Sequence, residues 1–248
     1  PKGTKVTLTV LRGDDNEKKE FDIIRDNIKL KAIYKKELVD KKNKIGYIHL
    51  ITFENKDAVD EVIAAIKELE KDGMKGLIFD VRNNGGGLLD NAIDIGSIFI
   101  KDGVIVHTID RDKNRETFEV SSVDYNWYDK PLIVLINGAS ASASEILAGA
   151  IENNHRGTLI GTQTFGKASV QNIKPFSDGA AILLTVAKYH TPDGSDINKI
   201  GISPNIEVKI PTETIKEAQQ EDYEYSQEKD TQLQAAIKEM QKLINQKK

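Results

Sequence analysis

The strongest candidate for a nucleophile lies in a short turn rich in serine, Asn137–Glu145, which reads Asn-Gly-Ala-Ser-Ala-Ser-Ala-Ser-Glu. An apolar run at 132–136 predicts a strand before this turn, and residues 145–151 predict a helix after it. A hydroxyl at a strand-to-helix turn points out of the fold, and the first N–H groups of the helix stay unpaired and can hold a developing oxyanion. The segment therefore indicates a nucleophile site, although small residues also simply let a helix start close to a neighbouring backbone. The candidate hydroxyls are those of Ser140, Ser142 and Ser144.

A lysine in a glycine-containing loop is the candidate general base. The loop Thr164-Phe165-Gly166-Lys167 leads into an apolar strand predicted at 169–173. A lysine that is shielded from water can lose its charge and take a proton from a serine. Most lysines lie on the surface and have no such role. We expect Phe165 and the apolar strand to provide the shielding that Lys167 requires.

Other kinds of site have weaker support. The four histidines show no metal-ligand spacing and no His-Glu-x-x-His motif, so we expect no metal site. A serine–histidine mechanism stays an alternative, but no histidine has an evident partner in the sequence. The triple glycine Gly85–Gly87 resembles a phosphate loop only superficially, because no Gly-Lys-Ser/Thr follows it. The histidines are His49, His107, His155 and His190.

Composition limits the classes of function. The chain has 248 residues, of which 39% are hydrophobic and 30% charged, which is typical of a soluble globular protein. The formal net charge of −4 gives no reason to expect nucleic acid or an anionic membrane as a partner. The absence of cysteine excludes disulfides and thiolate chemistry. No apolar run is long enough for an integral membrane segment, and the chain opens at Pro1 in mid-pattern, which suggests a piece of a longer protein.

Strands and helices alternate through the middle of the chain, which favours an α/β core with crossover connections. Asn55 is the expected N-cap of the first helix, and Gly73 follows that helix as a stop signal. The start of the chain predicts a small β-hairpin that is too small to be stable alone. Expected strands are 4–10, 21–24, 45–50, 77–81, 104–109, 117–120, 132–136, 158–161, 169–173 and 180–189.

Several motifs together resemble the carboxy-terminal processing proteases, a family of Ser-Lys peptidases that usually carry a PDZ domain. The resemblance runs in family order from about Lys31 to Pro211. Two positions depart from the family pattern: Gly85 replaces a proline, and Ala168 replaces a glycine, which matters only if that position has a positive φ. The matching segments are Asp80–Gly87, Ser140–Glu145, Thr164–Gln171, Lys188–Gly194 and Gly201–Pro204.

The resemblance implies a role for each site residue. It selects Ser142 as the nucleophile, Lys167 as the base, and Gln171 as a neutral group that orients the lysine amine from the same face of the strand. It also implies an oxyanion hole formed by two backbone N–H groups, one from Ala143 and one from the triple glycine, with Gly86 preferred. No cofactor is expected.

The fold implied by the resemblance is a crotonase/ClpP-like α/β core with a residual PDZ-type hairpin at the N-terminus and a helical C-terminal tail. We expect residues 1–28 to be the closing strands of a PDZ domain, 29–211 the peptidase core and cap, and 212–248 the tail. The tail has an apolar seam at coiled-coil-like spacing. Either this seam packs on its own domain, or it forms a homodimer. The seam residues are Leu233, Ile237, Met240 and Ile244.

These observations lead to one hypothesis and two alternatives. The hypothesis is an extracytoplasmic serine endopeptidase of the periplasm or cell envelope that cuts proteins near their C-termini. One alternative is an inactive peptide-binding module in which the Ser-Lys pair is vestigial. The other is a crotonase-like acyl-CoA enzyme, which would depend on a carboxylate in its pocket rather than on Ser142.

Overall fold

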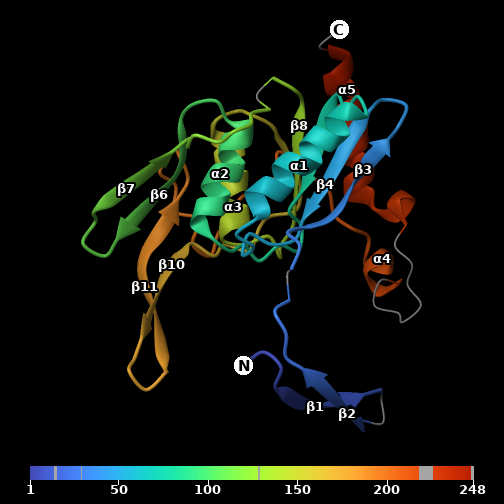
Figure 1. Ribbon diagram of the computed structural model, residues 1–248. Coiled ribbons are helices and arrows are strands. Elements are labelled where there is room, and N and C mark those ends of the chain that lie inside the picture. The colour runs from blue at the N-terminus through green and yellow to red at the C-terminus, as the bar shows by residue number, and fades with distance from the viewer. Residues whose placement is uncertain (14–15, 29, 128, 218–225, 247–248) are drawn as a thin grey trace. The chain divides into compact units, whose positions relative to one another are not determined.

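The computed structural model describes residues 1–13, 16–28, 30–127, 129–217 and 226–246. The chain divides into two compact units, Pro1–Lys31 and Ala32–Lys248, and the serine turn and the lysine loop both lie in the second (Figure 1). That unit is a mixed α/β structure, so the predicted fold class is confirmed. None of the helices in the described ranges has the length and apolar character that crossing a membrane requires.

A six-stranded sheet forms the centre of the second unit, in the order β12-β9-β8-β5-β4-β3. All neighbours pair in parallel except β3, which runs antiparallel to β4. Every residue of β5 and β8 is buried, as expected for central parallel strands that are covered on both faces. The strands are β3 (Ile33–Asp40), β4 (Ile45–Leu50), β5 (Gly76–Asp80), β8 (Leu132–Ile136), β9 (Thr158–Gly161) and β12 (Ile206–Glu207).

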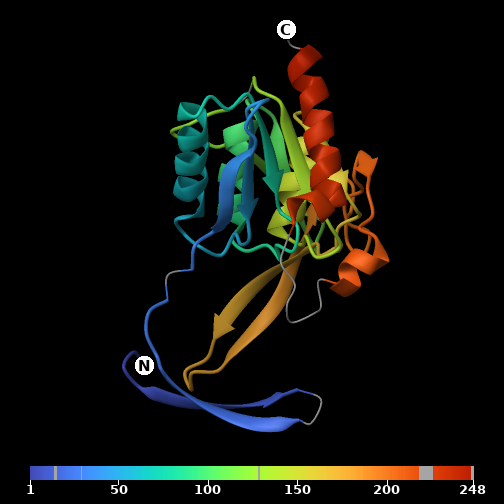
Figure 2. The ribbon, with the colours of Figure 1, turned by 90° about the vertical axis from the view of Figure 1, so that its right-hand side faces the viewer.

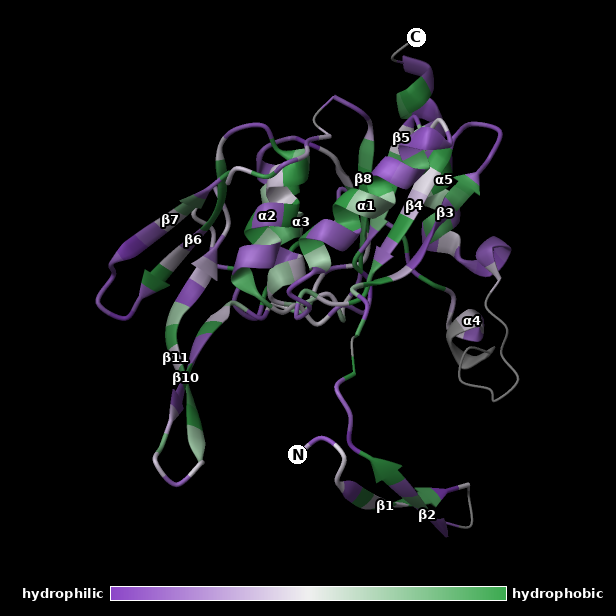
Figure 3. Cartoon of the chain, viewed as in Figure 1, coloured by the Kyte–Doolittle hydropathy of each residue, from purple (hydrophilic) through white to green (hydrophobic). Residues whose placement is uncertain are grey.

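Helices cover both faces of this sheet (Figure 2). Alternate strand residues point to opposite faces, so Leu77 and Phe79 contact the core of the first three helices, whereas Ile78 contacts the C-terminal helix. The amphipathic pattern of α1 is visible as purple and green bands (Figure 3). The helices are α1 (Ala58–Lys71), α2 (Leu89–Phe99), α3 (Ala143–Asn153), α4 (Thr212–Glu217), the 3-10 turn η1 (Gln227–Lys229) and α5 (Thr231–Gln246).

The N-cap of α1 differs from the prediction. The cap residue is Asp57, and Asn55 instead forms a turn in which its side-chain oxygen accepts the N–H of Asp57 at 2.9 Å. This local bond lets Asn55 end the preceding segment two residues before the N-cap of the helix.

A second, four-stranded antiparallel sheet has the order β10-β11-β6-β7. Its β10–β11 hairpin extends away from the helices of the second unit (Figures 1 and 2) and carries exposed apolar side chains, including Ile173, Phe176 and Leu183. The strands are β6 (Val104–Asp110), β7 (Arg115–Glu119), β10 (Ser169–Pro175) and β11 (Ala181–His190).

The N-terminal unit contains the predicted hairpin, formed by β1 (Lys5–Arg12) and β2 (Glu17–Ile24). The register is continuous, from Lys5 opposite Ile24 to Arg12 opposite Glu17. Apolar side chains of both strands stay exposed, among them Leu8 and Phe21.

The apolar seam of the tail packs on its own sheet. Leu233, Ile237 and Met240 are buried in a cluster with residues of β4, β5 and β8, and Ile244 is partly buried beside them. The chain itself therefore covers the surface that suggested a homodimer, because the second face of the central sheet requires a helix as much as the first.

We predict that the seam stabilises the fold rather than an assembly. Leu233→Ala and Met240→Ala should each lower the free energy of unfolding by about 2–5 kcal/mol, because each leaves a cavity against the sheet. Lys238→Ala, on the exposed side of the same helix, should leave stability unchanged. Urea unfolding and light scattering provide the two measurements. A Met240→Ala protein of unchanged stability and halved mass would contradict this prediction.

Candidate active site

Ser142 occupies the predicted strand-to-helix turn, as the N-cap of α3. Its backbone has φ 55° and ψ −115°, a combination that costs an L-residue conformational energy and recurs at functional turns. Ser142 is half-buried, and its hydroxyl donates no hydrogen bond to the described residues. The next N–H, that of Ala143, is likewise without a partner there.

The two flanking serines have structural roles. Ser140 is fully buried, and its hydroxyl donates to the Val81 carbonyl at 2.8 Å. Ser144 is also fully buried and donates to the Asn84 carbonyl at 2.9 Å. Both hydroxyls are therefore occupied in joining the serine turn to the glycine loop. Ser142 is the only one of the three that has access to solvent.

The serine turn and the glycine loop follow β8 and β5, which are adjacent parallel strands, so both lie at the carboxyl edge of the sheet. Asn83 and Asn137 bind each other across the two segments. The Asn83 N–H donates to Asn137 Oδ1 at 3.0 Å, and Asn137 Nδ2 donates to Asn83 Oδ1 at 2.9 Å. The Ala141 N–H adds a bond to the Asn84 carbonyl at 3.0 Å. Their relative position is therefore fixed by several hydrogen bonds.

Gly86 lies directly against the nucleophile turn. A Cβ at this position would be 2.7 Å from the Ala141 carbonyl oxygen, 2.8 Å from Ser142 Cβ and 2.9 Å from the Ala143 nitrogen, and its φ is +101°. Only glycine fits there. The Gly86 N–H, however, donates to Asn84 Oδ1 at 2.9 Å, so an oxyanion would have to share or displace that bond.

The flanking glycines differ from Gly86 in their N–H groups, and Gly85 differs from it also in the space around it. The N–H groups of Gly85 and Gly87 have no partner among the described residues. A Cβ on Gly85 would meet open space, whereas one on Gly87 would collide with the Phe53 backbone. The geometry thus leaves the choice of oxyanion donor within the triple glycine open.

The carboxylate of Glu145 joins the serine turn to the lysine loop. It is fully buried and accepts four hydrogen bonds. Oε2 accepts the N–H of Ser142 at 2.9 Å and that of Lys167 at 2.8 Å. Oε1 accepts the Thr164 hydroxyl at 2.6 Å and the Gly166 N–H at 2.7 Å. The backbones of the candidate nucleophile and the candidate base therefore meet at one oxygen atom.

The sequence reasoning missed this role of Glu145, although a signal for it was present. Ser142 and Glu145 have the Ser-x-x-Glu spacing of a capping box, in which the glutamate side chain accepts the N–H of the N-cap residue. The residues of α3 from Ala143 to Ile151 are all buried, and Glu145 is the only charged one among them.

The predicted shielding of Lys167 is wrong for this structure. Burial alternates along the loop, so that Thr164, Gly166 and Ala168 point inward while Phe165 and Lys167 point outward. Phe165 is 64% exposed and does not cover the amine. The amine makes no hydrogen bond or ion pair with the described residues, Ser142 included. The physical reason is that the loop turns its backbone N–H groups toward Glu145, which directs the intervening side chains outward.

Gln171 and Ala168 lie on either side of the start of β10, and the sequence made a prediction for each of them. Gln171 is exposed on β10 and has no hydrogen bond to Lys167, and the β10–β11 register shifts between Val170 and Gln171. The structure therefore does not bring these two side chains together. Ala168 is buried and is absent from the residues with positive φ, so the exchange of glycine for alanine introduces no backbone strain.

The histidines have no part in this site. His49 contacts the Arg82 carbonyl at 3.3 Å, and His107 contacts Thr117 Oγ1 and the Pro192 carbonyl. Burial lowers the pKa of His107 below its ordinary value. No histidine of the described ranges hydrogen-bonds Ser142, and no cluster of potential metal ligands occurs among those residues.

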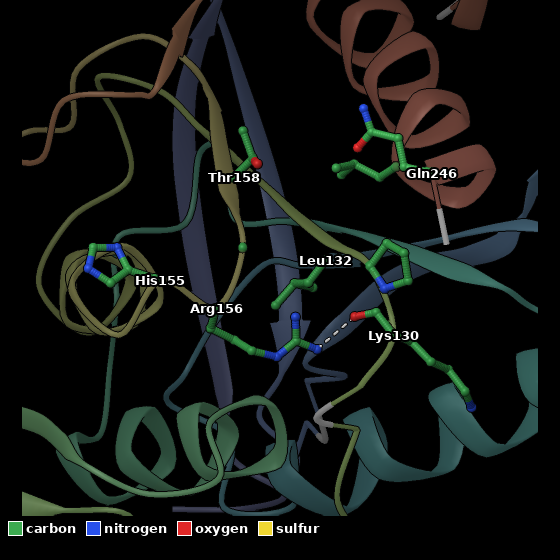
Figure 4. A pocket seen from close by; sticks show the side chains of 9 residues that line it. Lys130, Leu132, His155, Arg156, Thr158 and Gln246 are labelled. Carbon is green, nitrogen blue, oxygen red and sulfur yellow. Dashed lines mark hydrogen bonds between the residues drawn. The ribbon is translucent and has the colours of Figure 1, made fainter. Parts of the chain in front are cut away.

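A cavity of about 400 Å³ lies at the opposite edge of the sheet, where β8 and β9 begin (Figure 4). Arg156 lines it, but its guanidinium donates to the carbonyls of Phe99, Trp127 and Lys130. Burial lowers the pKa of Arg156 to about 10. We assign this guanidinium a structural role, because three backbone carbonyls already occupy it.

Several known proteins are similar to this chain in sequence and in fold. The chain is 43% identical over 213 residues to a carboxyl-terminal-processing protease of Synechocystis, with 85% of this chain and 49% of the relative covered. It is 45% identical over 220 residues to a carboxy-terminal-processing protease of Bartonella bacilliformis, with coverage of 85% and 48%. The chain thus spans about half the length of these curated relatives.

A solved structure and a family model agree with these relatives. The structure of a photosystem II D1 C-terminal processing protease superimposes with a TM-score of 0.66 at 31% identity, covering 85% of this chain and 58% of that one. The model of peptidase family S41 matches residues 44–208, more than half of the sequence. By sequence and by fold, the chain belongs to peptidase family S41.

Proposed function

We propose that this chain carries the catalytic core of a serine endopeptidase of the carboxy-terminal processing type. Ser142 is the nucleophile and Lys167 the general base. The observation that supports this most strongly is the shared carboxylate of Glu145, which holds the backbones of both residues, while the Ser142 hydroxyl donates no hydrogen bond to the described residues and Lys167 is exposed. The substrates are polypeptides that are cut near their C-termini, as the names of the relatives indicate for those proteins.

In the proposed reaction, the neutral amine of Lys167 takes the hydroxyl proton as Ser142 Oγ attacks the scissile carbonyl carbon. The carbonyl oxygen becomes an oxyanion, which accepts hydrogen bonds from the unpaired Ala143 N–H and from one N–H of the triple glycine, with Gly86 preferred. Lys167 then protonates the leaving amine, and an acyl-enzyme remains. The same lysine then deprotonates a water, whose oxygen bonds the acyl carbon. The ester bond to Ser142 Oγ breaks, Lys167 returns the proton to Oγ, and the acid product leaves.

The exposed amine of Lys167 implies that substrate completes the site. A polypeptide lying across Lys167 would exclude water from the amine and favour its neutral form. Gln171 would orient the amine in that state. Asn84 would then share or release the Gly86 N–H.

The remaining features of the whole protein follow the family. We propose that residues 1–28 belong to a PDZ domain, and that the protein works outside the cytoplasm, in the periplasm or cell envelope, as the family resemblance implies. A homodimer would have to use a surface other than the apolar seam of α5, which is already covered.

We predict that the Ser-Lys pair acts as a unit. Ser142→Ala, Lys167→Ala and Lys167→Arg should each reduce hydrolysis of fluorescein-labelled casein by roughly a thousandfold or more, since guanidinium stays protonated and cannot replace the amine. Replacing each histidine singly by Gln should preserve most of the activity. An active Lys167→Arg enzyme, or a folded but inactive His→Gln variant, would point to a histidine base.

A second prediction concerns the glycine loop. Gly86→Ala should lower kcat about tenfold or more, because its Cβ would push against Ser142 and Ala143. Gly85→Ala is the matched control and should retain most activity, since its Cβ meets open space. Equal losses in the two variants would show that the loop acts through its flexibility rather than through the close approach of Gly86.

A third prediction concerns Glu145. Glu145→Gln should lower the free energy of unfolding by about 1–3 kcal/mol, because the amide NH2 group would face at least one buried N–H donor. Casein hydrolysis should fall with it. The variant would contradict our assignment if it kept full activity.

Glu152→Gln, on the same helix, is the control for Glu145→Gln. Burial and the nearby Asp193 raise the pKa of Glu152, so its ionised form opposes folding. Glu152→Gln should therefore match the wild type in acid and become more stable than it as the pH rises through that pKa. Thermal melts across this range measure the difference.

A further inference from the structure

A buried ionic cluster joins the start of α5 to the glycine loop. The side chains of Arg82, Asp80 and Asp230 are 9%, 1% and 7% exposed. Arg82 forms a two-pronged pair with Asp230, with Nη1 to Oδ1 at 2.9 Å and Nη2 to Oδ2 at 2.8 Å. Asp80, at the end of β5, accepts Nε at 3.0 Å and Nη2 at 2.6 Å.

Neutral groups complete the cluster. Gln232 Oε1 accepts Arg82 Nη1 at 3.0 Å, and the Tyr47 hydroxyl donates to Asp80 Oδ2 at 2.7 Å. Burial alone would lower the pKa of Arg82, but Asp80 and Asp230 outweigh it and raise that pKa. The guanidinium is therefore permanently charged and fixed in orientation.

Attachment of α5 does not require these charges. The helix already buries Leu233, Ala236, Ile237 and Met240 against the sheet. Removing charges from water is expensive, so a buried ion pair is weak evidence for a stabilising role and better evidence for fixing a geometry. The geometry that this cluster can fix is that of the residues following Arg82.

Those residues form the loop of the candidate site. The Arg82 carbonyl contacts His49 Nε2, and the following residues, Asn83 and Asn84, bind the serine turn. Asn84 in turn accepts the N–H of Gly86. Arg82 is the first residue of the five-residue segment 82–86, which ends at Gly86. The position of the Arg82 side chain therefore fixes where this segment begins.

We infer that Asp230 is a positioning residue for catalysis, which acts through Arg82 on the glycine loop and so on the oxyanion donor opposite Ala143. This inference rests on the proposed function. Asp230 touches no reacting atom. It lies directly before α5, 148 residues after Arg82 in the sequence, and neither the motifs nor the resemblance pointed to it.

The test is Asp230→Asn in the full chain. Asparagine is as good an N-cap as aspartate, so the bond that Leu233 N donates to Oδ1 at 3.0 Å is preserved, while one oxygen facing the guanidinium becomes an NH2 group. We expect kcat on casein to fall roughly ten- to a hundredfold with KM little changed. The rate at which a fluorophosphonate labels Ser142 should fall in parallel.

Leu233→Ala is the matched control. It weakens the packing of the same helix without touching Arg82, so it should lower the melting temperature and leave kcat unchanged at a temperature where the protein is folded. If Asp230→Asn behaves like Leu233→Ala, with a lower melting temperature and a normal kcat, the inference is wrong. If Asp230→Asn does not fold, Gln232→Ala decides, with a several-fold loss of kcat expected and an unchanged kcat contradicting us.

A different experimental result would contradict the proposed function. Casein hydrolysis that persists in Ser142→Ala and Lys167→Ala would overturn the Ser-Lys assignment, whatever Asp230→Asn does. If Ser142→Ala and Lys167→Ala lose their activity as predicted but the Asp230→Asn enzyme is fully active, only the positioning role is overturned.

Discussion

The candidate site depends on the buried carboxylate of Glu145. Two segments of different origin, the turn after β8 and the loop before β10, meet there because each supplies N–H groups that the fold buries. Buried N–H groups require acceptors, and a carboxylate with four donors satisfies them in one place. The side chains of Ser142 and Lys167 then project from a common base. The chemistry proposed for them follows from this arrangement of the backbone.

The hold of Glu145 on the two backbones also explains why the side chains of Ser142 and Lys167 are not hydrogen-bonded to each other in this structure. With their backbones held by Glu145, Ser142 and Lys167 are close in space but are not hydrogen-bonded to each other through their side chains. The amine lies in solvent, and the Gly86 N–H is occupied by Asn84. In the proposed mechanism, a substrate would therefore have to cover the amine and release that N–H before the reaction begins.

Local signals allowed much of the fold to be predicted. Apolar runs with β-branched residues identified β5 and β8, and helical periodicity identified α1. The edge strand β3 escaped, because its Lys35, Lys36 and Glu37 interrupt the apolar pattern, as charges on edge strands often do. In the site, the serine, lysine and glycine segments were found as contiguous motifs. The role of Glu145 was not, since three of its four donors lie 19 to 22 residues away and become neighbours only in the fold.

The link between Arg82 and Asp230 has a consequence for how the protein is made. A ribosome adds about 5–20 residues per second, so Arg82 is synthesised roughly 7–30 s before the residue that fastens it, 148 positions later. During that interval one face of the nascent sheet lacks its covering helix, and the guanidinium lacks half of its counter-charge. A chain interrupted before α5 would carry the nucleophile turn, the base and the glycine loop without the last tether that aligns them. If Asp230 has the positioning role inferred for it, hydrolysis would begin only after α5 has been synthesised and has packed on the sheet.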